Sequence, residues 1–214
     1  MHQMKIIVLI AGGRTGSDFF QSLLDGHSEI SQLPGVFYYD KFWLQIQNEK
    51  KIENISKIFI EEHKRFFDSR FNIIERHNIL GENKDSFFSV NKELFNQYFI
   101  DFMKEKKIDQ YNLLCSLNLA YSKASNEDVN KKKIIILHLH HLQRIKLIKE
   151  LNFEIIYTIR DPLASYTSIV NHWSKYLYLN GKSMTPKIYY YNLYRIFDGL
   201  NNLIEHKKKT HVIQ

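Results

Sequence analysis

Lys5-Ile-Ile-Val-Leu-Ile-Ala-Gly-Gly-Arg-Thr-Gly-Ser17 is the segment of this 214-residue chain that decides the fold. After the leading lysine, residues 6–11 are apolar and rich in β-branched side chains, which is typical of a strand buried on both faces of a parallel sheet. A glycine-rich turn follows. The spacing of the apolar residues after this turn predicts one buried stripe of a helix, formed by Phe19, Phe20, Leu23 and Leu24.

Two later segments, Lys133–His138 and Phe153–Arg160, repeat the strand pattern. The segment between them, Leu142–Leu151, has helical spacing. The order strand, helix, strand predicts right-handed βαβ units and a parallel sheet. We therefore expect an α/β fold with three layers (α/β/α) around a central parallel sheet, as in P-loop nucleotide hydrolases.

The middle of the chain, from about residue 42 to 125, has a different composition. It is rich in Lys, Glu, Asn, Phe and Ile, nearly free of Gly and Pro, and its periodicity is mostly helical. No Pro/Gly/Ser linker marks a boundary, so we interpret it as a helical insertion or cap in a single domain spanning residues 1–214. Residues 187–207 predict a further helix. The chain then stops inside an apparent strand, 210–214, which suggests a truncated C-terminus.

The bulk composition limits where the protein functions. Cys115 is the only cysteine and lies in an apolar run, so we expect a buried, unreactive thiol and no disulfide within the chain, which suits a reducing cytosol. The longest apolar runs have about six residues, well below the roughly 18–20 of a membrane span. The N-terminal run is also too short for a signal peptide. These features predict a cytoplasmic protein.

The formal net charge of +7 attracts anions in general and does not choose among partners. Two lysine runs, Lys131–Lys133 and Lys207–Lys209, supply part of this charge, and we expect both to be solvated. They lack the interleaved aromatic residues of a platform for stacking bases. Nucleic acid is therefore not the expected partner.

The glycine-rich turn is the first candidate site. A loop between a buried strand and a helix presents backbone N–H groups and the positive end of the helix dipole to an anion. Gly12, Gly13 and Gly16 allow close approach of the backbone, and Arg14 can add a bidentate contact to a phosphate. The turn is not a Walker A motif, because Gly-Lys-Ser/Thr is missing. A phosphate site and a plain tight turn both fit this pattern.

Arg160-Asp-Pro-Leu-Ala-Ser-Tyr-Thr-Ser168 is the second candidate site. Asp161-Pro162 predicts a helix start with proline in the first turn. Arg160 then lies at the carboxyl end of a strand, where ligands bind in open α/β sheets. Ser168, two turns along the helix, is a possible second ligand of the same anion. The alternative is that Arg160 caps or forms an ion pair at the sheet edge and Ser168 lies on the surface.

Together the two segments resemble the sulfotransferases that use PAPS (3′-phosphoadenosine 5′-phosphosulfate). The 5′-phosphosulfate loop of that family commonly reads Arg/Lys-Ser-Gly-Thr-Ser/Thr, and residues 14–18 read Arg-Thr-Gly-Ser-Asp. The 3′-phosphate motif of the family places an Arg eight residues before a Ser, as Arg160 and Ser168 are here. The resemblance covers about residues 5–40 and 133–175.

The resemblance implies in-line transfer of the sulfuryl group from PAPS to a hydroxyl or amine of a small-molecule or glycan acceptor. The products are the sulfated acceptor and PAP (adenosine 3′,5′-bisphosphate), and no metal is required. Arg14 would stabilise charge on the bridging oxygen. The resemblance assigns to the donor Gly13, Arg14, Thr15, Gly16, Ser17, Asp18, Arg160 and Ser168.

Two positions depart from the family pattern. Asp18 stands where Ser or Thr is usual, and its carboxylate would repel a bound phosphate unless it points away. Val36 stands where many relatives carry a Glu as general base. Other relatives use a His at the end of the strand before the 3′-phosphate motif.

Histidines follow the second predicted strand. His138 lies 22 residues before Arg160, and His138 and His140 share one side of that strand. The pKa near 6.5 of an ordinary histidine suits a base, so both are candidate catalytic residues, with Asp40 as an outside candidate; polar residues at a strand end are the alternative. We expect no metal at His138, His140 and His141, because no carboxylate lies in ligand spacing.

Other functions also fit an α/β chain with a glycine-rich turn. One is a P-loop kinase or other nucleotide phosphotransferase, which the missing Gly-Lys-Ser/Thr and the missing strand-end Asp for magnesium disfavour. Another is a non-catalytic nucleotide- or nucleic-acid-binding protein, which the missing Glu would suit. Oligomeric state and acceptor leave no signal in the sequence.

Overall fold

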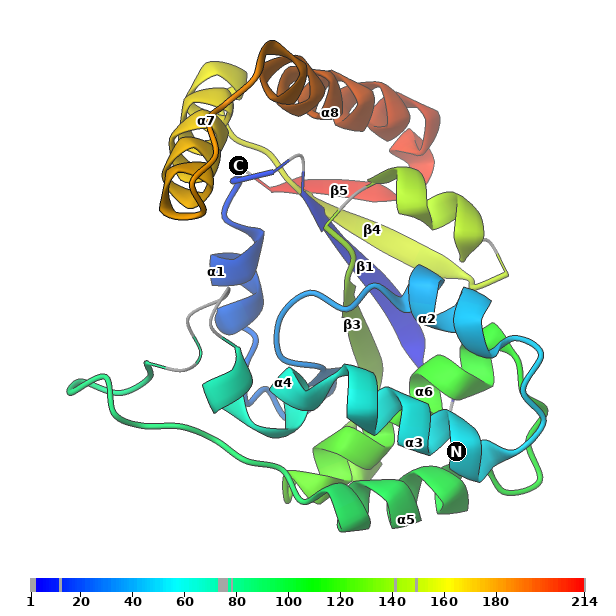
Figure 1. Ribbon diagram of the computed structural model, residues 1–214. Helices are drawn as coiled ribbons and strands as arrows, with labels where there is room; N and C mark the ends of the chain where they lie inside the picture. The colour runs from blue at the N-terminus through cyan, green and yellow to red at the C-terminus, as the bar shows by residue number, and fades with distance from the viewer. Residues whose placement is uncertain are drawn as a thin grey trace.

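The computed structural model describes residues 3–11, 13–72, 77, 79–140, 142–148 and 150–213. Gly12 and His141 of the predicted sites lie outside these ranges. At the centre is a five-stranded sheet with the order β2-β3-β1-β4-β5 (Figure 1), and every pairing is parallel. The strands are β1 (Lys5–Ala11), β2 (Ile30–Gln32), β3 (Ile134–His138), β4 (Phe153–Thr158) and β5 (Thr210–Ile213). The predicted α/β fold with a parallel sheet is confirmed.

Strand β1 lies in the middle of the sheet, which explains its continuous apolar run. It pairs with β3 along residues 5–9 and with β4 along residues 6–11. After β1 the chain forms β2 and β3, which both lie on one side of β1. It then crosses to the other side of β1 and forms β4. The carboxyl ends of β1, β3 and β4 therefore meet where the direction of winding reverses, which is where open α/β sheets bind ligands.

Helices cover both faces of the sheet, and the predicted helical character of residues 42–125 is confirmed. No helix within the described ranges combines the length and apolar character that crossing a bilayer requires. The helices are α1 (Ser17–Ser22), α2 (Tyr39–Ile46), α3 (Ile52–Glu62), α4 (Lys64–Phe67), α5 (Lys92–Met103), α6 (Gln110–Ala124), α7 (Pro162–Leu179) and α8 (Pro186–Glu205). Short 3₁₀ helices occupy Ser69–Phe71, Val129–Lys131, Leu142–Leu147 and Lys207–Lys209.

One hydrophobic core joins the helices of the middle segment to the sheet. Ile6, Val8 and Ile10 alternate along β1 and point into this core. Opposite them, a group of buried aromatic rings from α2 to α5 includes Phe59 and Phe95, which stack with ring centroids 5.4 Å apart. The helical segment thus packs directly on one face of the sheet.

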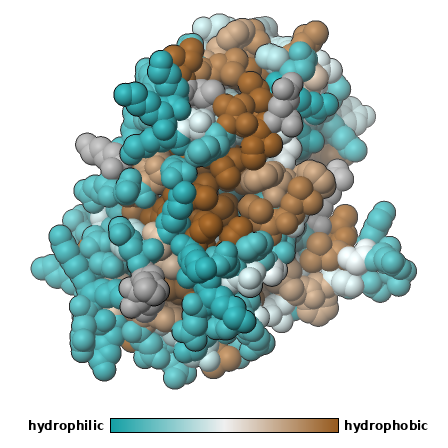
Figure 2. All heavy atoms as spheres, turned by 180° about the vertical axis from the view of Figure 1, so that it is seen from behind, coloured by the Kyte–Doolittle hydropathy of each residue, from teal (hydrophilic) through white to brown (hydrophobic). Residues whose placement is uncertain are grey.

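The opposite face of the sheet is covered more thinly. Ile7, Ile134 and Ile156 project from this side of their strands and are only half-buried. Figure 2 shows apolar side chains exposed in the middle of the side of the molecule that lies behind the view of Figure 1. The short helix α1 packs on this face, next to the carboxyl ends of β1 and β3.

The predicted buried stripe of the first helix is wrong. Phe19 and Leu23 are 69% and 64% exposed, and the buried residues of α1 are Ser17 and Gln21. The helix turns its polar side towards the sheet because His138, at the end of β3, bonds to both of these side chains. A polar contact at the sheet edge therefore decides the orientation of α1.

Three further expectations need correction. The predicted helix at Leu142–Leu151 is a 3₁₀ helix over Leu142–Leu147. Its apolar residues recur every three positions, which suits three residues per turn. The strand predicted to reach Arg160 ends at Thr158. Lys132 is not solvated: its side chain is 3% exposed and pairs with Glu127 at 2.6 Å.

Candidate nucleotide site

The turn between β1 and α1 has a strained backbone that glycine makes possible. Gly13 and Gly16 have φ values of 104° and 86°, and Arg14 between them has a φ of 52°. A Cβ atom added at Gly13 would lie 3.1 Å from Cδ1 of Ile169 in α7. Glycine at position 13 is thus favoured both by the positive φ and by the close approach of α7.

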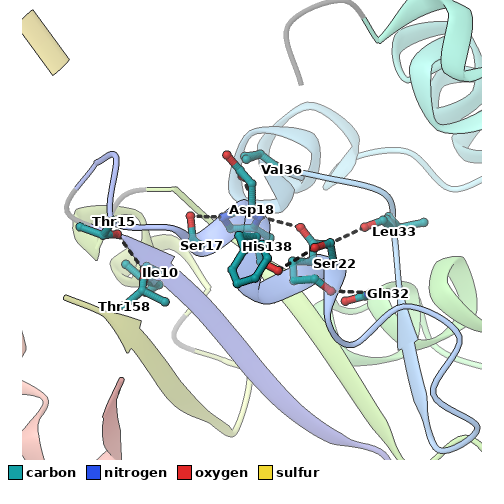
Figure 3. A network of polar contacts seen from close by, with 12 residues as sticks. Ile10, Thr15, Ser17, Asp18, Ser22, Gln32, Leu33, Val36, His138 and Thr158 are labelled. Carbon is teal, nitrogen blue, oxygen red and sulfur yellow. Dashed lines mark hydrogen bonds and ion pairs between the residues drawn. The ribbon is translucent and has the colours of Figure 1, made fainter. Parts of the chain in front are cut away.

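A hydroxyl pair ties this turn to the end of β4. Thr15 Oγ1 lies 2.8 Å from Thr158 Oγ1, and Thr158 is 3% exposed. Figure 3 shows the pair at one end of the polar network, beside Ile10 of β1. The role of Thr158 was not predicted, and its one signal in the sequence is a polar residue at the end of an apolar strand.

The second predicted segment forms as expected around the start of α7. Asp161 caps the helix, since its carboxylate accepts a hydrogen bond of 2.7 Å from the backbone N–H of Ala164. Pro162 is the first helical residue. Arg160 is exposed immediately before the cap, beyond the carboxyl end of β4.

The two predicted segments meet at one point. Arg14 Nε donates a long hydrogen bond of 3.4 Å to Ser168 Oγ, across 154 residues of sequence. The Arg14 side chain is exposed and Ser168 is half-buried. A hydrogen bond of this length is weak, so either group can exchange it for a ligand.

His138 lies beneath α1 and is 1% exposed. Its Nδ1 is 2.8 Å from Gln21 Oε1 and its Nε2 is 3.1 Å from Ser17 Oγ (Figure 3). The Gln21 amide nitrogen donates to the Leu33 carbonyl at 2.9 Å, so its oxygen faces the ring. It follows that Nδ1 carries the proton and Ser17 donates to Nε2.

The environment keeps His138 neutral. Burial, with a smaller contribution from the nearby His140, lowers its pKa to about 3. The ring centroids of the two histidines are 5.6 Å apart, and His140 is half-buried. Gln21, which orients His138, was not predicted, because the buried stripe of this helix was expected at Phe19, Phe20, Leu23 and Leu24.

The other candidate base positions have structural partners. Asp40 is 1% exposed and its carboxylate accepts a hydrogen bond of 2.7 Å from Arg144 Nη1. Val36 is buried, and its carbonyl accepts a hydrogen bond of 2.5 Å from Arg65 Nη2. Asp40 is therefore buried in an ion pair and does not face solvent as a general base would, and Val36 has no group that takes up a proton.

Asp18 lies in the first turn of α1, where a carboxylate interacts favourably with the helix dipole. Its side chain is 60% exposed, and its Oδ1 is 3.8 Å from His138 Nδ1. It also lines a cavity of about 170 Å³ whose walls include Asp25, Pro34 and Phe88. Asp18 therefore stands between the candidate nucleotide loop and an open cavity.

Comparison with known proteins gives a distant similarity to a solved structure. No family model and no curated protein matches the chain. Among solved structures, the chain is similar to the "Sulfotransferase Domain from the Curacin Biosynthetic Pathway", with 14% sequence identity and a TM-score of 0.44. The match covers 98% of this chain and 66% of the other, so this chain spans about two thirds of that protein's length. A similarity this distant assigns no activity to the chain.

Proposed function

We propose that this chain is a sulfotransferase that binds PAPS at the carboxyl edge of β1 and β4. The sulfuryl group would pass to a hydroxyl or amine of a small-molecule or glycan acceptor. The observation that carries the proposal is the contact of 3.4 Å between Arg14 Nε and Ser168 Oγ. It brings together two segments that were each predicted to bind a phosphate.

The chemistry of the site suits a nucleotide with two separate anionic groups. The turn at residues 13–16 offers backbone N–H groups and the exposed Arg14 guanidinium to a 5′-phosphosulfate. Arg160 and Ser168 would hold the 3′-phosphate, which distinguishes PAPS from ATP. Ser17 would join the first set through its backbone N–H, because its hydroxyl already donates to His138.

The proposed reaction is a direct displacement at sulfur. The acceptor oxygen or nitrogen forms a bond to sulfur while the bond from sulfur to the bridging oxygen of the 5′-phosphate breaks, and PAP leaves. Arg14 stabilises the charge that develops on the bridging oxygen. His140 is proposed to take the acceptor proton in preference to His138, because both nitrogens of the buried His138 are already engaged.

Donor binding is tested by following the melting temperature with PAP, AMP and ATP. A ligand at a hundred times its dissociation constant stabilises the folded state by roughly 2.7 kcal/mol, which is about 5–10 °C for a domain of this size. We expect PAP to give this shift and AMP and ATP to give much less. A shift with ATP alone would favour a kinase, and no shift with any of the three would reject the proposal.

Variants locate the effect. Arg160→Ala and Ser168→Ala should each weaken PAP binding, by about tenfold or more for the arginine, because a hydrogen bond to a charged group contributes roughly 1.5–3 kcal/mol. Lys175→Ala removes an exposed charge further along α7 and is the matched control. Equal losses in Arg160→Ala and Lys175→Ala would mean that only the overall charge matters.

Transfer itself needs a separate measurement. Sulfur-labelled PAPS is incubated with panels of hydroxyl and amine acceptors, and labelled product is counted. Arg14→Ala should lower transfer by about a hundredfold while PAP binding falls less. A chain that binds PAP yet transfers to no acceptor would be a nucleotide-binding protein and not an enzyme.

A further inference from the structure

The fold gathers two histidines and a carboxylate that lie far apart in the sequence. Three possible ligand atoms lie within 4.8 Å of one another, one each from Asp18, His138 and His140. His138 ends β3, and His140 follows it on the same side. Asp18 comes from the first turn of α1. A carboxylate absent from ligand spacing in the sequence is therefore supplied by tertiary structure.

We propose that Asp18, His138 and His140 bind a divalent transition-metal ion of the zinc type. Two imidazoles and one carboxylate, with a fourth position open, are a typical donor set for such ions. Zinc bonds of about 2.0–2.1 Å place tetrahedral ligand atoms about 3.3 Å apart. Asp18 Oδ1 and His138 Nδ1 are 3.8 Å apart, and the exposed Asp18 side chain has room to close the difference.

The surroundings of His138 supply the second layer of contacts that metal ligands need. With the ion on Nδ1, the proton moves to Nε2, which then donates to Ser17 Oγ at its present distance of 3.1 Å. A ligating histidine typically makes such a bond with its other nitrogen. Gln21 Oε1, now 2.8 Å from Nδ1, then loses the hydrogen bond that it accepts from Nδ1. Its side chain either moves aside or binds the ion through this oxygen.

Bound to the ion, His140 could not take the acceptor proton, so the base role proposed above belongs to the metal-free chain. The ion would also change the charge beside the candidate phosphate loop. The Asp18 carboxylate alone repels a phosphate, whereas the carboxylate with a divalent ion carries a net charge of +1. Tighter PAP binding in the presence of the ion follows from this, and that consequence rests on the proposed function. Metal binding itself does not, because it is measured without nucleotide.

The test is calorimetric titration of the metal-free chain with Zn²⁺, supported by the visible absorption of Co²⁺, which reports tetrahedral coordination. We expect one Zn²⁺ per chain. Asp18→Ala and His140→Ala should each weaken binding by at least about tenfold and abolish the Co²⁺ absorption. Both side chains are at least partly exposed, so both variants should fold, which their melting curves verify.

Two controls separate this site from chance binding at the surface. Asp25→Ala removes another carboxylate that lines the same cavity, and His27→Ala removes an exposed histidine just beyond α1. Both should bind Zn²⁺ within about twofold of the unchanged chain. The proposal is overturned if the chain takes up no Zn²⁺, if Asp18→Ala and His140→Ala bind as tightly as the unchanged chain, or if a control loses as much affinity as they do.

Discussion

Thr15 and Thr158 share a hydroxyl–hydroxyl hydrogen bond of 2.8 Å across 143 residues of sequence. It fastens the turn after β1 to the last residue of β4, the strand beside it. Because Thr15 follows Arg14 directly in the chain, this hydrogen bond helps to position the backbone of Arg14.

Thr158→Val removes the hydroxyl with little change of shape. We expect a loss of about 1 kcal/mol in the free energy of unfolding, since the buried hydroxyl bond disappears, together with weaker PAP binding. Thr167→Val is the control, because the Thr167 hydroxyl donates to the Leu163 carbonyl of its own helix. Urea unfolding measures the stability of both variants, and the shift of melting temperature with PAP measures their binding. Equal small losses of stability in the two variants would show that the threonine pair does not hold the turn.

Gly13→Ala should be costly for two reasons. The φ of 104° is unfavourable for alanine, by roughly 1–2 kcal/mol, and the new methyl would press on Ile169 Cδ1 at 3.1 Å. Melting temperature and PAP affinity should both fall. Adding Ile169→Val removes Cδ1 and should restore part of the stability.

Gly26→Ala is the matched control for this position. Its φ is also positive, 74°, but no atom lies within 4 Å of the added Cβ. Gly26→Ala should lower the free energy of unfolding only by the cost of the positive φ, and it should leave PAP binding unchanged. If Gly26→Ala impairs PAP binding as much as Gly13→Ala does, the effect is general destabilisation.

His63 should make the protein less stable in mild acid. It packs among phenylalanine rings, stacking on Phe59 with centroids 4.8 Å apart, and burial lowers its pKa to about 4. The unfolded chain, with a histidine pKa near 6.5, takes up a proton first as the pH falls. Stability is therefore lost between pH 6.5 and about 4, by roughly 2 kcal/mol at pH 5.

The variant His63→Phe isolates this effect. It keeps the ring packing and removes the titrating group, so its urea midpoint should fall less between pH 7.5 and pH 5 than that of the unchanged chain. All other titrating groups contribute to both curves. Parallel curves would show that His63 remains neutral or charged alike in the folded and unfolded states.

The buried pair of Asp40 and Arg144 should show strong coupling. Asp40 is 1% exposed and Arg144 Nη1 lies 2.7 Å from its carboxylate. Arg144→Leu leaves an unpaired buried charge and should cost about 3–5 kcal/mol, whereas the double variant with Asp40→Leu should cost less than the two single changes together. The exposed pair of Lys5 and Glu154 is the control, and Lys5→Ala should cost at most about 1 kcal/mol. Additive losses in the Asp40 and Arg144 cycle would contradict the coupling.

Much of the fold was predictable because its signals are local. Residues 6–11 and 134–137 are each an unbroken apolar run, which predicts a strand buried in a sheet that is covered on both sides. Asp161-Pro162 predicted the start of α7, because a capping carboxylate and a proline in the first turn stabilise a helix through contacts within a few residues. The succession of strand, helix and strand along the chain also predicted right-handed βαβ units, in which ligands bind at the carboxyl ends of the strands.

The orientation of α1 and the partners of the site were decided only by tertiary structure. Phe19 and Leu23 have the spacing of a core stripe, yet the helix buries Ser17 and Gln21 because His138 of a neighbouring strand meets them. The contacts of Arg14 with Ser168, of Thr15 with Thr158 and of Asp18 with His138 depend on which strands lie side by side. Local sequence preference sets each segment's conformation, but the pairing of distant side chains is set by strand order and packing, which no single segment contains.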